Sequence, residues 1–84
     1  MNDYLDLCFI WYRDVLLYKA AGSEEQLIFR EQALEIRRQA EKSTYHGLQQ
    51  ILEAIETADR RIRANVNFDL TMEMLAMTIK ENIG

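Results

Sequence analysis

The stretch from Arg60 to Glu73 restricts the fold of this chain more than any other segment. It begins with three arginines among four residues, crosses the polar break Asn65-Val66-Asn67 and continues at once into apolar and acidic residues. Cations favour the C-terminal end of a helix dipole, and carboxylates favour the N-terminal end. Asn67 suits the N-cap, where its side-chain oxygen can accept a hydrogen bond from an unpaired backbone N–H. The stretch therefore predicts a helical hairpin.

Helix-breaking residues are scarce in the rest of the chain. Its 84 residues include three glycines and no proline, and no segment alternates apolar and polar residues as a strand would. We therefore expect an all-α fold, a small four-helix bundle. The helices are expected at about 3–21, 29–42, 44–65 and 68–82, the third capped by Ser43 or Thr44. Gly22 should end the first in a left-handed conformation, and residues 23–28 should form a connection with up to one helical turn.

Length and composition indicate one domain. A chain of this size buries only ~60–65% of its unfolded surface, and an apolar share of 49% can fill such a core. No apolar run approaches the ~20 residues of a membrane span, and no basic region precedes the first apolar segment. A single cysteine, Cys8, excludes an internal disulfide. We expect Cys8 to be buried and the protein to be cytoplasmic.

No arrangement of residues supports catalysis, a metal site or a cofactor. His46 and Cys8 are the only histidine and cysteine, and the glycines are too scattered to form a phosphate-binding loop. The net charge of −4 argues against general phosphate binding. Acidic neighbours flank both basic groups, at Arg37–Arg38 and at Arg60–Arg63. These groups are therefore interpreted as solvated helix surface rather than as a nucleic-acid interface.

Two of the expected helices carry a single apolar stripe. The stripe of the second is narrow, whereas that of the third is broad and typical of a core helix. The residues are Phe29, Ala33, Ile36 and Ala40 in the second helix, and Leu48, Ile51, Leu52, Ile55, Ala58 and Ile62 in the third.

The first and fourth helices are apolar on two sides. In the first, the main face is Tyr4, Cys8, Trp11, Val15 and Tyr18, extended by Leu5, Tyr12 and Leu16, while Ile10 and Leu17 project among Asp6, Arg13 and Asp14. In the fourth, the core arc is Phe68, Met72, Leu75, Ile79 and Ile83. A second apolar arc, formed by Leu70, Met74 and Met77, lies roughly opposite. Four short helices cannot cover all these faces, which predicts a partner. The candidate interface residues are Ile10, Arg13, Leu17, Leu70, Met74 and Met77.

Two parts of the chain have patterns known from one family. The first is Trp11-Tyr12-Arg13-Asp14, followed by an apolar run and by Lys19 before Gly22. The second runs from Leu48 through Ile62 and continues with Asn65-Val66-Asn67 and Leu70…Met72-Glu73…Leu75. Together they resemble the C-terminal region of bacterial clamp-loader subunits, in particular the delta-prime family of DNA polymerase III, over essentially the whole chain. One departure is Phe68, because the family commonly has proline there.

The resemblance implies a helical collar domain, excised from a longer AAA+ subunit. In such clamp loaders the C-terminal domains of five subunits form a ring, and the AAA+ modules bind ATP, the sliding clamp and DNA. Residues 1–84 would then be a single non-catalytic oligomerisation domain in DNA replication. Its partners would be the gamma/tau and delta subunits, with no direct contact to nucleic acid or membrane.

Three alternatives remain open at the level of sequence. Ile10 and Leu17 could pack against further collar helices upstream rather than against a neighbouring subunit. The chain could be a stand-alone homodimeric helical protein, because C₂ pairing is the usual way to bury an extra apolar face. It could also be the related gamma/tau collar domain, from which we separate it mainly by Asn65-Val66-Asn67.

Overall fold

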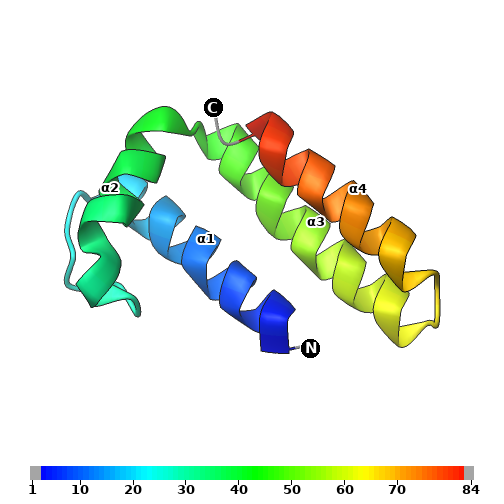
Figure 1. Cartoon of the computed structure of the whole chain (residues 1–84). Coiled ribbons are helices and arrows are strands. Elements are labelled where there is room, and N and C mark those ends of the chain that lie inside the picture. Colours follow the sequence, from blue (N-terminus) through cyan, green and yellow to red (C-terminus); the bar gives the residue numbers. More distant parts are fainter. Residues whose placement is uncertain (1–2, 83–84) are drawn as a thin grey trace.

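The computed structural model describes residues 3–82 and is all-helical, which confirms the predicted fold class. Its elements are α1 (Asp3–Ala21), a 3₁₀ helix (Arg30–Gln32), α2 (Ala33–Lys42), α3 (Tyr45–Arg63) and α4 (Phe68–Asn82). Figure 1 shows α3 and α4 side by side as a hairpin, α1 along the other side of α3, and α2 at the far end of α1. Within residues 3–82 no helix combines the length and the apolar character that a membrane crossing requires.

The helices form a thin layer. Backbone contacts join α2 to α1, α1 to α3 and α3 to α4. The Cα atoms extend over 39 × 23 × 15 Å, so the arrangement is flattened in one direction. The radius of gyration of 13.0 Å is larger than the ~12 Å expected for a compact domain of this length. A layer of this kind leaves two broad faces open.

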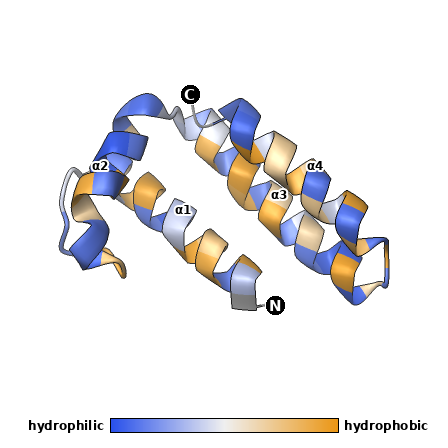
Figure 2. Cartoon of the chain, in the orientation of Figure 1, coloured by the Kyte–Doolittle hydropathy of each residue, from blue (hydrophilic) through white to orange (hydrophobic). Residues whose placement is uncertain are grey.

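The core consists of two clusters, and α3 contributes to both. Figure 2 shows that α2 is largely hydrophilic, whereas apolar residues recur along α1, α3 and α4. The predicted stripe of α3 is confirmed, with its outer members Leu52 and Ile62 half-buried. One cluster joins α1, α2 and the start of α3, and the other joins α1, α3 and α4. The first contains Val15, Leu27, Ala33, Ile36, Ala40 and Leu48, and the second contains Leu5, Ile51, Ile55, Ala58 and Leu75.

The predicted hairpin between α3 and α4 is confirmed, although α3 ends two residues earlier than expected. Asn65 adopts a left-handed conformation with φ +59°. Its N–H donates to the Ile62 carbonyl (3.1 Å), and the Val66 N–H donates to the Arg61 carbonyl (2.9 Å). This is the Schellman pattern, which pairs carbonyls that the helix end leaves free. Asn67 then caps α4, because its Oδ1 accepts from the Leu70 N–H at 2.9 Å.

The other helix ends follow from local chemistry as well. Gly22 has φ +67° and its N–H donates to the Tyr18 carbonyl at 2.7 Å, so it ends α1 as predicted. Of the two candidate caps for α3, the structure selects Thr44, whose hydroxyl accepts from the Gly47 N–H at 2.9 Å. Ser43 is the C-cap of α2 instead.

The connection before α2 departs from the prediction. We expected an α-helix from Phe29 and Asp14 among exposed polar residues, but Asp14 is 0% exposed and the α-helix begins at Ala33. Asp14 Oδ2 accepts from the backbone N–H of Ile28 (3.0 Å) and of Phe29 (2.8 Å). This carboxylate holds the connection against α1 and fixes the bend at residues 28–29 before the 3₁₀ helix. Residues 23–28 contain a turn closed from Leu27 N–H to the Glu24 carbonyl (3.2 Å).

Three residues predicted to be in the core are more accessible than expected. Cys8 is half-buried, and Tyr4 and Phe68 are exposed. Phe68 begins α4 at the hairpin end, which extends beyond the N-terminal end of α1 in Figure 1. Ile83, the last member of the predicted core arc of the fourth helix, lies outside the described residues.

Replacement of Asp14 by alanine should destabilise the fold. The change leaves two backbone N–H groups without their acceptor, and we expect the free energy of unfolding to fall by about 2–4 kcal/mol. Asp14→Asn should lose less, because an amide oxygen can still accept both bonds. Urea unfolding measures the difference, with Asp6→Ala as the control on the same helix. Equal stability of Asp14→Ala and the wild type would contradict the role of this carboxylate.

A charge in the α3 stripe should prevent folding. Ile55 is fully buried, and an unpaired carboxylate there costs several kcal/mol, much of the total stability of a small domain. Far-UV circular dichroism of Ile55→Asp should therefore show loss of helix. Glu56→Asp, on the exposed side of the same helix, should keep the wild-type spectrum. A folded Ile55→Asp variant would mean that α3 does not organise the core.

Candidate interaction surfaces

The described residues present several apolar and charged surfaces. No group of three or more histidine, cysteine, aspartate or glutamate side chains in residues 3–82 is arranged to hold a metal ion. His46 is exposed in the first turn of α3. The features with functional potential are therefore apolar and charged surfaces, which are found on α4, between α3 and α4, and on α1.

Three apolar side chains project from α4 away from the core. Leu70 is 53% exposed, Met74 44% and Met77 61%. They stand on the side of α4 opposite Met72 and Ile79, which pack against the second cluster. The predicted exposure of this second arc is confirmed, and its contact with a partner remains a prediction. We refer to Leu70, Met74 and Met77 as the outer arc of α4.

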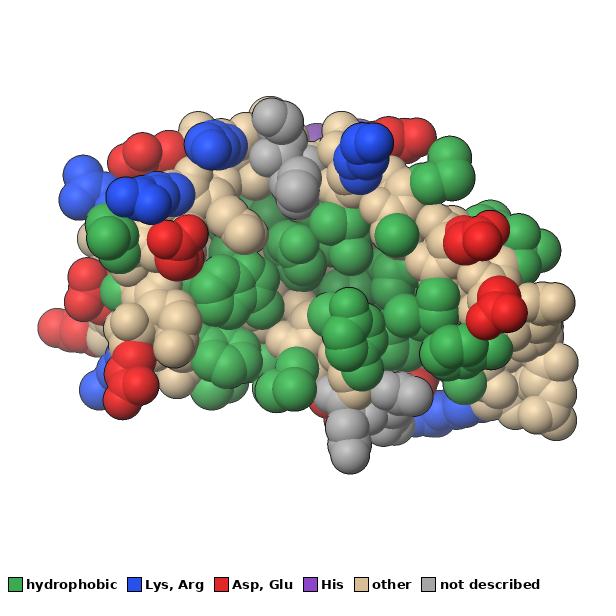
Figure 3. Space-filling model, viewed as in Figure 1, with side chains coloured by type: hydrophobic (Ala, Val, Ile, Leu, Met, Phe, Trp, Pro, Cys, Tyr) green, Lys and Arg blue, Asp and Glu red, His purple; other side chains and the backbone are tan. Residues whose placement is uncertain are grey.

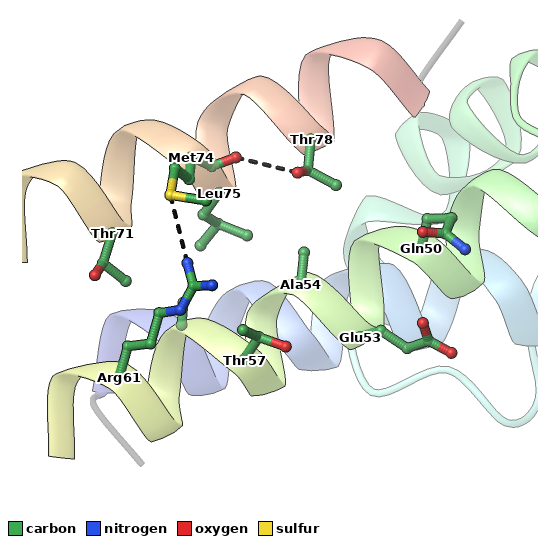
Figure 4. Close-up of a pocket in the computed structure, with 10 residues that line it drawn as sticks. Gln50, Glu53, Ala54, Thr57, Arg61, Thr71, Met74, Leu75 and Thr78 are labelled. Atoms are coloured by element: carbon green, nitrogen blue, oxygen red, sulfur yellow. Dashed lines mark hydrogen bonds between the residues drawn. The ribbon is translucent and has the colours of Figure 1, made fainter. Parts of the chain in front are cut away.

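A groove runs between α3 and α4 beside the outer arc. It has a volume of about 240 Å³ and is lined by Gln50, Glu53, Ala54, Thr57, Ala58, Arg61, Thr71, Met74, Leu75 and Thr78. Figure 4 shows Arg61 reaching across to α4, with Gln50 and Glu53 at the other end of the groove. Arg61 Nη1 lies 3.4 Å from the Met74 sulfur. We refer to this feature as the α3–α4 groove.

The three arginines at the end of α3 have different partners. Arg63 pairs with Asp59 at 3.2 Å, and the Asp59 side chain is 9% exposed. Arg60 donates to the Thr57 hydroxyl at 3.2 Å. Arg61 makes no ion pair within residues 3–82, and it donates a hydrogen bond to the weakly accepting thioether of Met74. Within residues 3–82, the arginine cluster that the sequence analysis interpreted as solvated surface thus contains two guanidiniums without a carboxylate partner, Arg60 and Arg61, and of these Arg61 lies against α4.

The candidate residues on α1 have mixed environments. Arg13 is exposed, whereas Ile10 and Leu17 are half-buried, and Leu17 packs against the first core cluster. The cluster that Leu17 contacts includes Leu27 of the connection, which Asp14 holds against α1. The structure therefore does not bring these three residues together with the outer arc of α4, and their role in an interface remains a prediction.

The open apolar surface of α1 lies elsewhere, along its N-terminal half. Tyr4 is 62% exposed and Leu7 57%, and Trp11 packs against Phe29 with ring centroids 5.6 Å apart. Together they line a shallow groove of about 340 Å³, and the lining residues are Tyr4, Leu7, Cys8, Trp11, Tyr12 and Phe29. Figure 3 shows apolar side chains across the centre of one broad face, with charged groups mainly at its edges. Sequence reasoning assigned most of this surface to the core.

The phenols of this aromatic groove are uncharged at neutral pH. Burial raises the pKa of Tyr12 above its usual value of 10.0, and the nearby Cys8 and Tyr4 raise it further. Cys8 also raises the pKa of Tyr4, because a thiolate there would repel a phenolate. The groove therefore presents neutral aromatic and apolar groups at physiological pH.

Comparison with known proteins gives one informative likeness. No model of a known protein family matches the chain, and no solved structure matches it. Over 77 residues, which are 92% of this chain, it is 32% identical to subunit delta′ of DNA polymerase III from Bacillus subtilis (strain 168). The match covers 23% of that subunit, so the chain spans less than a quarter of its relative. The chain is thus similar to one region of a DNA polymerase III subunit, over almost its whole length.

Proposed function

We propose that this chain is a non-catalytic oligomerisation domain of a delta-prime-type clamp-loader subunit. It would be the collar portion of a longer AAA+ protein and would help to assemble the ring that loads the sliding clamp. Its partners would be the gamma/tau and delta subunits, and it would act in the cytoplasm without contacting DNA. The likeness to subunit delta′ supports the assignment to this class.

The observation that carries an interaction role is the exposure of the outer arc of α4. Leu70, Met74 and Met77 lie within two helical turns of one another and are each about half-exposed. Contiguous exposed apolar side chains of this kind mark contact sites more often than isolated ones do. The net charge of −4 argues against a nucleic-acid partner. A protein neighbour that covers the arc is the role most consistent with these properties.

A charge in the outer arc should abolish association without unfolding the chain. We expect Met74→Asp to weaken binding to a gamma/tau collar fragment at least about tenfold, because an interface core excludes unpaired charge. Isothermal titration calorimetry measures the affinity, and circular dichroism checks that the helix content is unchanged.

Two matched variants make this experiment decisive. Leu34 on α2 is 61% exposed, so Leu34→Asp adds the same charge away from the arc and should leave binding intact. Leu75→Asp changes a buried neighbour on α4 and should unfold the chain. Unchanged binding of a Leu70→Asp, Met74→Asp double variant would refute the assigned surface. A wild-type chain that forms stable dimers and ignores the collar fragment would favour the homodimeric alternative.

A further inference from the structure

The α3–α4 groove carries charges of opposite sign at its two ends. Arg61 and Glu53 are both on α3 and eight residues apart, which corresponds to about 12 Å along the helix axis. Neither makes an ion pair with another residue in the range 3–82. Between them the groove is lined by apolar groups of Ala54, Met74 and Leu75. Arg61 therefore lies at one end of the groove and Glu53 borders the other end, with apolar groups between them (Figure 4).

The unpaired state of Arg61 has a local cause. A helix brings residues four apart into contact, and Arg63 uses this spacing to pair with Asp59. Arg61 has Thr57 at the same spacing, and the Thr57 hydroxyl already accepts from Arg60. Arg61 instead lies half-buried across the groove against the Met74 sulfur. A guanidinium has five N–H donors and matches a carboxylate in a bidentate geometry, so most of its donors remain available to a partner.

We propose that the α3–α4 groove binds an amphipathic helix of a partner protein, with a carboxylate on Arg61 and a cation about two turns away on Glu53. An apolar side chain between these two charges would cover Met74 and Leu75. This inference deepens the interaction role proposed above by naming the chemistry of the docked segment.

The opposite charges of Arg61 and Glu53 favour binding of a helix over binding of a nucleic acid. A phosphate backbone would satisfy Arg61 but would be repelled by Glu53, whereas a helix can present opposite charges two turns apart on one face. A third helix laid between two packed helices also follows the usual mode of helix-in-groove recognition. The outer arc of α4 borders the groove through Met74, so the same segment would cover part of it.

A designed peptide tests the proposal directly. The probe is a fluorescein-labelled helical peptide of about 16 residues, with Glu and Lys eight positions apart and Leu between them. Fluorescence anisotropy should show saturable binding to the 84-residue chain below about 1 mM, and amide shifts should change at Ala54, Thr57 and Thr78. Arg61→Gln should weaken binding about tenfold. Arg37→Gln, which alters an exposed arginine of α2, should leave it unchanged.

Charge reversal at the other end provides the sharper control. Glu53 is exposed, so Glu53→Lys should fold normally while making both ends of the groove positive. This variant should prefer a Glu/Glu peptide to the Glu/Lys peptide, the reverse of the wild type. Absence of peptide binding at about 1 mM, or equal peptide preference in both proteins, overturns the proposal. So does single-stranded DNA binding that depends on Arg61. The peptide result is independent of the gamma/tau experiment, so the two proposals can fail separately.

Discussion

The apolar stripe of α3 is buried by the helices on both sides of α3, and the rest of the structure depends on this burial. Ile51 and Ile55 are fully buried, and they belong to the cluster that joins α1, α3 and α4. Within residues 3–82, α3 contacts both of the long helices α1 and α4, whereas α2 and α4 lie at opposite edges of the layer. Gly47 adds to this arrangement: a Cβ there would lie 2.9 Å from the Asn82 carbonyl oxygen. The absence of a side chain lets the end of α4 approach the start of α3.

The helix ends could be predicted from sequence because they depend on contacts between near neighbours in the chain. Asn67 and Gly22 act within four residues of their own positions, so their residue type was sufficient. The start of α2 could not be predicted in this way. It depends on Asp14, which lies 14 and 15 residues from the N–H groups it accepts. In the sequence this aspartate is indistinguishable from an exposed one.

The same contrast between local and long-range contacts explains which exposed surfaces could be predicted from the sequence. The outer arc of α4 follows from helical periodicity alone, because α4 packs on one neighbour and its far side is open. On α1, periodicity identifies an apolar face but not how much of it α2 covers. Tyr4 and Leu7 stay open because α2 reaches only the C-terminal half of α1, and that depends on the connection. The free guanidinium of Arg61 does have a signal in the sequence, namely Thr57 in place of a carboxylate one turn earlier.

The flattened arrangement of the helices limits how many partner proteins this small chain can bind at once. The Cα atoms extend over 39 and 23 Å in the two longer directions, so each broad side offers about 900 Å², of the order of the ~800 Å² that one protein contributes to a standard interface. One partner protein would therefore cover a whole broad face, and a second partner could bind only to the opposite face. With one neighbour on each broad side, a single layer of helices would separate two larger proteins.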